Sequence, residues 1–250
     1  MDSRAVESLV EWLMEARRAV FLTGTELSAE SGVVDFASPA FNPPIGEFRS
    51  SRRVRSAYWK RLRDLYPVLA EAEPNAAHVA VAELEALGML DSLFTLAADG
   101  LHYRAGSSVV MELNSTVLWI VCTRCGKGYE LEAALALLDR GSDVPECDSC
   151  GSDLLKPEIS FPGQPPPHWE LREAWMRLRG CDLFVLAGAD VSREPASSLP
   201  WIAKEQGARV AVISQQPGPF DEFADAVVYA KPSDVLSHVV EMVKERMPVS

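Results

Sequence analysis

Four of the five cysteines form two short pairs, and their spacing constrains the fold more than any other feature of the sequence. Cys122 and Cys125 make one Cys-x-x-Cys pair, Cys147 and Cys150 make a second, and 21 residues separate the two pairs. Each pair can direct two thiolates at one ion from a tight turn, and two pairs complete a tetrahedral zinc site. Such a closed shell has no open position for water, so it stabilises a fold and does not catalyse a reaction.

Two disulfides or a thioredoxin-like redox pair are the alternatives for the same spacing. The chain shows no secretory signal pattern, and the fifth cysteine, Cys181, lies in an apolar run. We therefore expect reduced thiols, a structural zinc ion and a cytoplasmic location.

The composition is that of an ordinary folded protein of 250 residues, 48% of them hydrophobic and 24% charged. This length suffices for one large core and a smaller appendage. We expect no membrane partner, because no apolar stretch is long enough to span a bilayer. A net charge of −12 argues against a nucleic-acid partner. The one basic cluster, from Arg49 to Arg63, is interpreted as the solvated side of a helix.

Short apolar runs alternate with amphipathic segments, a pattern typical of a parallel sheet covered by helices. The expected strands are Ala19–Leu22, Leu93–Leu96, Val109–Leu113, Asp182–Ala187 and Arg209–Ile213. Apolar residues three and four apart predict a helix around Val6, Val10 and Leu13, and another from Ala77 to Leu87.

Two segments interrupt this alternation and predict a second, smaller domain. The first runs over 37–75 and begins with many Pro and Arg residues, and the second runs over 115–165 and holds the cysteine pairs. The sequence thus predicts an α/β fold with a Rossmann-like large domain of residues 1–36, 76–114 and 166–250. The two insertions form the small domain, a helical module plus a zinc ribbon, and the proline-rich run 162–167 is a loop.

Many short motifs, in order, resemble those of the sirtuins, the NAD-dependent protein-lysine deacylases. They are Gly24-x-x-x-Ser28-x-x-Ser31-Gly32 with Asp35-Phe36, Pro74-Asn75-x-x-His78, Asp99-Gly100-Leu101-His102, Glu112-Leu113, the cysteine pairs, Leu155-Lys156-Pro157-x-Ile159, Gly163, Gly188 and Pro195-Ala196. The resemblance covers almost the whole chain. It implies a large Rossmann-like domain, a small zinc-ribbon and helical domain, and a cleft between them where NAD and an acylated peptide meet.

The chain departs from this family at the catalytic base. Sirtuins carry a histidine in a Glu-Leu-His-Gly motif, whereas this chain reads Glu112-Leu113-Asn114-Ser115. An asparagine amide has no useful basicity near pH 7, so it cannot take the proton from a ribose hydroxyl. General base catalysis is typically worth about 10²–10⁴ in rate, so we expect a trace of activity at best.

Several positions that the resemblance assigns to NAD are altered as well. The altered segments are Gly24-Thr25-Glu26, Ala37 after Asp35-Phe36, Leu96-Ala97-Ala98 before Asp99, Gly188-Ala189-Asp190, and Ser214. These changes remove donors and add two carboxylates, Glu26 and Asp190, around a dianionic ligand. Gly24, Ser28, Asp35, Phe36, Asp99 and Gly188 remain as cofactor-binding positions, and NAD binding is expected to be very weak or absent.

Two further features bear on the substrate. Tyr58 and Arg61 match a Tyr-x-x-Arg pair that one sirtuin class uses to hold the carboxylate of succinyl- or malonyl-lysine, and a surface tyrosine and arginine are the alternative. In the segment 159–164, Pro162 and Gln164 replace the family's usual residues where a substrate peptide pairs as an added strand. Proline removes an amide donor there.

The sequence therefore predicts a sirtuin-like protein with a structural zinc that is a catalytically inactive pseudo-enzyme. Its expected partner is a protein, an acylated peptide or an anionic ligand. The alternative is a NAD-dependent protein-lysine deacylase with weak or unusual activity, of which a desuccinylase-like or demalonylase-like enzyme is one form.

Overall fold

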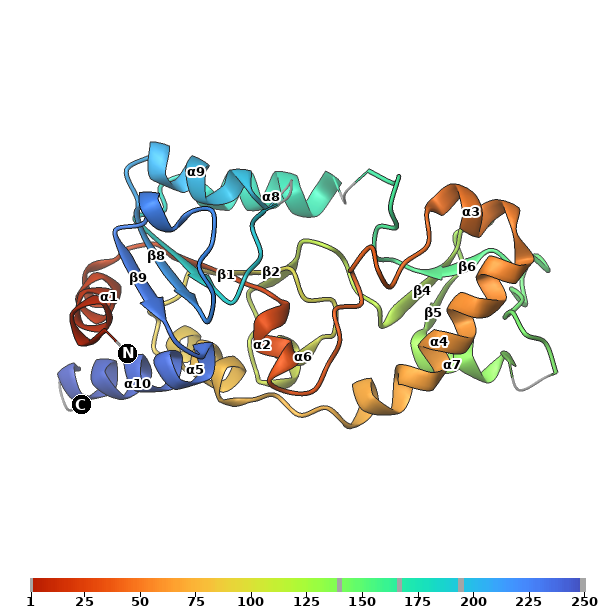
Figure 1. The fold of residues 1–250 in the computed structure, drawn as a ribbon, viewed down its shortest axis with the longest axis horizontal. Helices are drawn as coiled ribbons and strands as arrows, with labels where there is room; N and C mark the ends of the chain where they lie inside the picture. Colours follow the sequence, from red (N-terminus) through yellow and green to blue (C-terminus); the bar gives the residue numbers. More distant parts are fainter. Residues whose placement is uncertain (1, 139–140, 166–167, 193–195, 248–250) are drawn as a thin grey trace.

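The computed structural model describes residues 2–138, 141–165, 168–192 and 196–247, and shows an elongated molecule with a sheet at each end (Figure 1). Pro166, Pro167 and Pro195, which entered the predicted loop and the family motifs, lie outside the described residues. Within the described ranges, no helix is both long and apolar enough to cross a bilayer.

A six-stranded parallel sheet forms the larger part, with strand order β3-β2-β1-β7-β8-β9. Its strands are β1 (Ala19–Thr23), β2 (Ser92–Thr95), β3 (Val110–Glu112), β7 (Leu183–Ala187), β8 (Arg209–Ser214) and β9 (Ala226–Tyr229). Five of them were predicted to within one or two residues at each end. β9 was not predicted.

Helices cover both faces of this sheet, as the alternation along β1 requires. Phe21 faces a core shared with α1 (Ser3–Glu15), α5 (Ala76–Ala86) and α10 (Pro232–Arg246). Val20 and Leu22 face the opposite core, shared with α8 (His168–Leu178) and α9 (Ser198–Glu205). Figure 1 shows the two helix layers on either side of the sheet. Because both faces are buried, the strands read as continuous apolar runs. The predicted Rossmann-like class is confirmed.

The smaller part contains a three-stranded antiparallel sheet with strand order β5-β4-β6. Its elements are β4 (Trp119–Cys122), β5 (Gly128–Glu130), β6 (Leu155–Pro157), α3 (Ile45–Ser50), α4 (Arg52–Glu71) and α7 (Leu131–Ala136). Trp59, fully buried on α4, donates its indole N–H to the Leu155 carbonyl on β6 at 3.2 Å. This bond joins the helical segment of the first insertion to the sheet of the second.

The basic cluster is not simply a solvated helix side. Arg55 on α4 is buried and donates to the Asp153 carboxylate at 2.7 Å and to the Phe48 carbonyl at 2.8 Å. Arg52, half-exposed, binds Asp143 and Asp153. The two arginines therefore tie α4 to the cysteine-bearing segment. The proposed boundaries of the two domains remain a prediction.

Among the described residues, further short helices are α2 (Thr25–Ala29), α6 (Leu101–Arg104) and the 3-10 turn η2 (Asp221–Phe223). Both α2 and α6 lie between the two sheets in Figure 1. They follow β1 and β2 at the carboxyl edge of the large sheet, which is where parallel α/β folds place their ligand sites.

Candidate functional site

The backbones around Gly24 and Gly188 meet at the carboxyl ends of β1 and β7, the point where the strand order reverses. This contact is called the glycine crossing below. Gly24 donates its N–H to the Ala187 carbonyl at 3.2 Å, and Glu26 donates its N–H to the Gly188 carbonyl at 3.3 Å. A Cβ on Gly24 would lie 2.4 Å from the Gly188 oxygen, so only glycine fits there. Gly188 has φ +56°, in the region that glycine tolerates best. Both predicted cofactor glycines therefore lie at one topological switch point.

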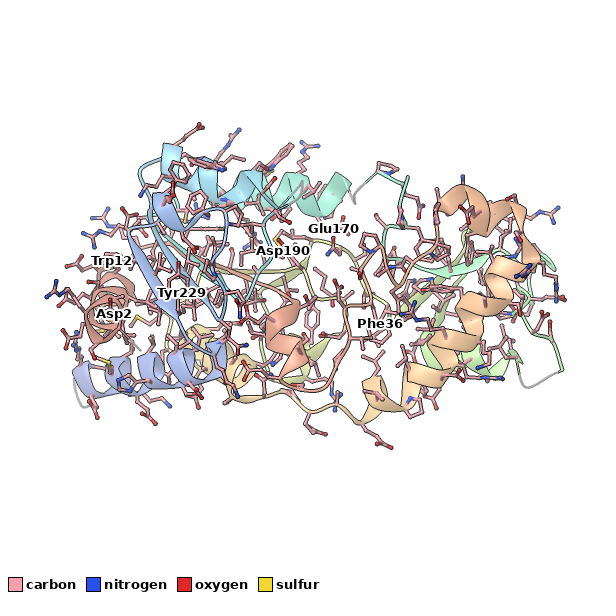
Figure 2. All side chains as sticks on the ribbon, viewed as in Figure 1. Asp2, Trp12, Phe36, Glu170, Asp190 and Tyr229 are labelled. Carbon is pink, nitrogen blue, oxygen red and sulfur yellow. The ribbon has the colours of Figure 1, made fainter. Side chains whose placement is uncertain are left out.

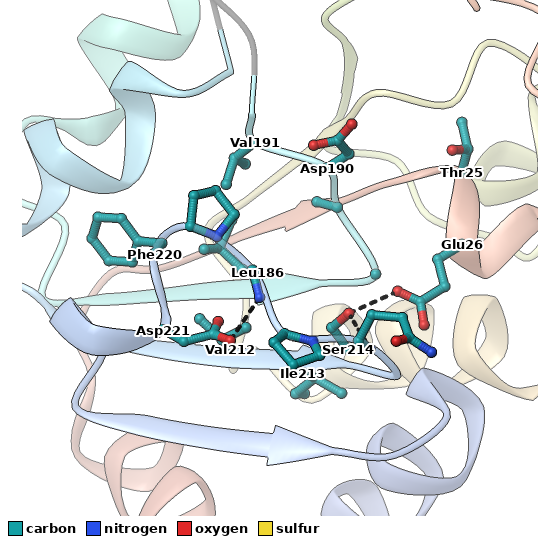
Figure 3. A pocket seen from close by; sticks show the side chains of 16 residues that line it. Thr25, Glu26, Leu186, Asp190, Val191, Val212, Ile213, Ser214, Phe220 and Asp221 are labelled. Carbon is teal, nitrogen blue, oxygen red and sulfur yellow. Dashed lines mark hydrogen bonds between the residues drawn. The ribbon is translucent and has the colours of Figure 1, made fainter.

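A cavity of about 270 Å³ opens beside this crossing, over the ends of β7 and β8 (Figure 3). Its apolar side chains include Leu186, Val191, Val212 and Phe220. Apolar walls with a few polar groups are typical of small-molecule sites.

Glu26 extends its side chain into this cavity and reaches the end of β8. Its Oε2 accepts the Ser214 hydroxyl at 3.1 Å (Figure 3), and its Oε1 accepts the Gln215 N–H at 2.8 Å. The sequence placed this carboxylate beside a pyrophosphate. In the structure Glu26 lies in the first turn of α2, and its carboxylate is bound at the end of β8.

The second added carboxylate, Asp190, is exposed and accepts the Ser192 N–H at 2.9 Å, within its own loop. It lies beside the large sheet, while Phe36 lies nearer to the small sheet (Figure 2). A third acid of the cavity, Asp221, uses Oδ2 to accept the Gly218 N–H and the Tyr229 hydroxyl, each at 2.7 Å. The carboxylates of Glu26, Asp190 and Asp221 thus each accept hydrogen bonds from the protein.

Polar groups gather on α2, α5 and α6 behind the crossing. Asp99 is 5% exposed and accepts the Leu101 N–H at 2.9 Å. His102 shares a 2.8 Å hydrogen bond with the Thr23 hydroxyl, and its ring centroid lies 4.7 Å from that of His78. Burial lowers the pKa of both histidines, that of His102 to about 3, so both rings are neutral at pH 7. The Ser28 hydroxyl is buried and has no hydrogen-bond partner within the described residues.

Asn114 donates its side-chain N–H to the Leu96 carbonyl at 2.8 Å. This bond fixes the amide at the end of β3, beside the segment that follows β2. The next residue, Ser115, has φ +57°, the only positive φ of a non-glycine residue in the described ranges. This is the position where the resemblance has glycine, so the backbone keeps the family's turn while the side chain has changed.

Glu112 lies two residues before Asn114 but lines a different cavity. Its neighbours there include Tyr103, Thr116, Glu158 and Trp169. Burial first, and then the charges of Asp99 and Glu158, raise the pKa of Glu112 to about 8. No contact in the described structure brings its carboxylate to the glycine crossing.

Tyr58 and Arg61 share one face of α4, as their spacing predicts. Tyr58 is 4% exposed, and its hydroxyl has no partner within the described residues. Arg61 is exposed, donates to the Ala40 carbonyl at 3.1 Å, and stacks over the Phe41 ring at 4.4 Å. The Phe41 and Tyr58 centroids are 5.7 Å apart, so both side chains flank Phe41.

The segment predicted to pair with a peptide packs close by. Phe161 lies 5.1 Å from Tyr58, centroid to centroid. Lys156, which the sequence analysis treated only as a motif residue, is buried and donates to the carbonyls of Pro157 and Ile159 at 2.6 and 2.8 Å. Lys156 therefore fixes the backbone at the start of this segment through hydrogen bonds.

Asp35 and Phe36 lie on the chain that leaves α2. Asp35 accepts the Ala37 N–H at 2.9 Å, and Phe36 is buried with its centroid 5.3 Å from that of Phe41. Phe36 thus belongs to the small aromatic core, whereas Gly24, Ser28 and Gly188 belong to the large-domain edge.

The four predicted cysteine ligands meet in one cluster, with all Sγ atoms within 4.8 Å of one another. The Sγ–Sγ distance is 3.7 Å both for Cys122–Cys150 and for Cys125–Cys147. A tetrahedron with Zn–S bonds of about 2.3 Å has edges of about 3.8 Å, so the donor set and its geometry fit zinc. The Tyr129 hydroxyl donates to Cys147 Sγ at 3.1 Å.

A parallel α/β sheet with a crevice at its switch point, joined to a small four-thiolate module, places the protein among Rossmann-like α/β proteins with a small metal-type module. Comparison with known proteins narrows this class. The Sir2 family model matches residues 24–195, more than half of the chain. The chain belongs to the Sir2 family, the sirtuins.

Its relatives cover almost the whole chain. A NAD-dependent protein deacetylase of Thermodesulfovibrio yellowstonii is 34% identical over 96% of this chain and 95% of its own length. NAD-dependent protein deacylase 2 of Archaeoglobus fulgidus is 33% identical over 96% of each. A solved Sir2 structure with a p53 peptide and NAD+ has a TM-score of 0.87 at 32% identity, covering 96% of this chain and 99% of that one. Another, of Sir2 bound to acetylated peptide, has the same TM-score and identity over 95% and 98%.

Proposed function

We propose that this protein uses NAD as a protein-lysine deacylase of low turnover. The sequence favoured an inactive pseudo-enzyme, with a weak deacylase as the alternative. The relatives are NAD-dependent deacetylases and deacylases, and nothing in them points to inactivity, so they favour the alternative.

The observation that carries the proposal is the preserved crevice at the ends of β1, β7 and β8. Gly24 and Gly188 bring the ends of β1 and β7 into a contact that is too close for any Cβ, and the adjoining cavity has apolar walls. The two added carboxylates were the main charge argument against NAD. Their side chains are bound to Ser214, Gln215 and the loop after β7, which weakens that argument. The residues present therefore fit the adenosine half of the cofactor.

In this proposal Gly24, Ser28, Asp99 and Gly188 are the residues that hold NAD. The bound cofactor supplies an electrophilic ribose carbon to the acyl oxygen. The buried Ser28 hydroxyl has no partner among the described residues, and such an unsatisfied polar group is typical of a functional site. Asn114 can orient a hydroxyl through its amide oxygen but cannot take its proton, so the turnover is low.

The substrate in this proposal is an acylated protein segment. Support comes from relatives solved with acetylated and p53 peptides and from the segment of Ile159 and Phe161, which Lys156 contacts. Arg61 favours an acidic acyl group, because its guanidinium is exposed over Phe41, while the Tyr58 hydroxyl on the same helix face is buried and has no partner among the described residues.

Titration calorimetry with NAD and ADP-ribose, followed by a deacylation assay on acetyl- and succinyl-lysine peptides, tests the proposal. Micromolar binding together with slow, NAD-dependent release of the acyl group supports it. Binding of neither ligand at millimolar concentration contradicts it.

A second candidate is favoured by one observation, the hydrogen bond from Asn114 to the Leu96 carbonyl. It holds a non-basic side chain in place of the family's base, as expected of a protein that binds acylated peptides without turning them over. Peptide binding with no acyl release, with or without NAD, would select this function.

A further inference from the structure

The crevice of this chain has the two parts of a dinucleotide site, but one of them comes from an unexpected segment. In dinucleotide-binding folds, a glycine turn after one strand faces the pyrophosphate, and an acidic residue near the end of the next strand binds the ribose hydroxyls. Here β7 ends at the Gly188 turn and β8 is its neighbour. The residue at the end of β8 is Ser214, which carries no charge.

Glu26, which follows β1, supplies a carboxylate at the end of β8. Its backbone N–H is bound to Gly188, and its two carboxylate oxygens are bound to Gln215 and Ser214. The side chain is therefore fixed at both ends and half-buried on the cavity wall. A carboxylate accepts about four hydrogen bonds and here uses two within the protein. Two acceptor positions remain for the hydroxyls of a diol.

The carboxylate of Glu26 would repel a further phosphate on the ribose that it binds. No Lys or Arg is among the described residues that line the cavity. Sites that accept a ribose 2′-phosphate place an arginine there, and two like charges at about 4 Å repel even near a protein surface.

We propose that Glu26 accepts hydrogen bonds from the adenosine ribose diol and makes this chain selective for NAD over NADP. The inference rests on the proposed use of NAD and adds to it the residue that sets cofactor specificity. Glu26 replaces a glycine of the family motif, so this is a property of this chain's own sequence.

The experiment is titration calorimetry of the zinc-loaded, full-length protein, which needs no deacylation. The ligands are NAD, NADP, and NAD lacking the adenosine 2′-hydroxyl. We expect the wild-type protein to bind NADP at least 100-fold, and the deoxy ligand about 10-fold, more weakly than NAD. Glu26→Gln should reduce the ratio of the affinities for NAD and NADP at least 10-fold. Glu26→Ala should bind NAD and the deoxy ligand with equal affinity.

Asp190→Asn is the matched control, because it removes one negative charge from the same cavity without touching Ser214 or Gln215. It should leave the NAD-to-NADP ratio within about 2-fold of wild type. Equal narrowing by Asp190→Asn and Glu26→Gln would overturn the inference in favour of a general charge effect.

Wild-type protein that binds NAD and NADP equally would overturn the inference while leaving the proposed function intact. If neither NAD nor ADP-ribose binds, both fail together. Thermal melts of each variant without ligand show whether the variant is folded, and an unfolded Glu26→Gln leaves the deoxy-ligand comparison on wild-type protein to decide.

Discussion

At the scale of single residues, Glu112 and Ser115 lower the stability of the folded protein. Both lie within two residues of Asn114, which stands in place of the family's catalytic base. Ser115 holds a left-handed backbone conformation that costs a residue with a Cβ about 1 kcal/mol or more. Ser115→Gly should therefore raise the free energy of unfolding by about 0.5–1 kcal/mol, measured by urea denaturation. Ser115→Ala, which keeps the Cβ and loses only the hydroxyl, is the control. No gain of the glycine variant over the alanine variant would contradict this prediction.

The second unfavourable residue, Glu112, should make stability depend on pH. Its pKa of about 8 in the folded protein lies above the ordinary value of 4.5, so the folded state keeps a proton that the unfolded state releases between these values. The unfolded state then binds fewer protons, and stability falls as pH rises through this window. Glu112→Gln should gain about 1–3 kcal/mol over wild type at pH 8 and almost nothing at pH 4.5.

Urea denaturation at the two pH values measures this difference. Glu7→Gln is the control, because Glu7 is exposed on α1 and makes the same chemical change without burial. A gain for Glu112→Gln that is the same at both pH values would show that the carboxyl is not protonated in the folded state.

At the scale of elements, the small sheet depends on the cysteine cluster. β4, β5 and β6 have three or four residues each, too few to form a stable sheet alone, and Cys122 lies at the end of β4. Structural zinc sites supply apparent binding free energies of about 10–16 kcal/mol. Cys147→Ser, or a strong chelator, should therefore remove hydrogen-exchange protection from β4 and β6 and preserve it in β1 and β7.

Mass-resolved hydrogen exchange, together with zinc analysis, measures this outcome. Cys181→Ser is the matched control, since Cys181 is a buried thiol outside the cluster. It should retain about one zinc per chain and full protection of the small sheet. Loss of zinc without loss of protection would mean that the sheet is held by packing alone.

At the scale of the whole molecule, the sequence predicted what depends on local pattern. The buried strands of the large sheet were visible as apolar runs, and the zinc cluster as paired cysteines. β9 was missed because it is short and only partly buried, and Arg55 was misjudged because its acidic partner Asp153 lies 98 residues away. Nor could the sequence show that Glu26 reaches Ser214, 188 residues away, since a side chain's direction depends on the completed sheet.

The activity of the whole molecule depends on whether only the base is missing. If the crevice binds NAD as proposed, the one chemical function lost is proton transfer, because Asn114 already stands at the end of β3 with its amide bound to the Leu96 carbonyl. Asn114→His should then raise kcat for deacylation by about 10²-fold or more, with the affinity for NAD changed little. The measurement is single-turnover release of the acyl group by Asn114→His and by Asn114→Gln. The glutamine variant is the control, because it enlarges the side chain without adding a base. If the histidine variant is as slow as the glutamine variant although NAD binds, the cleft of this chain serves recognition and not turnover.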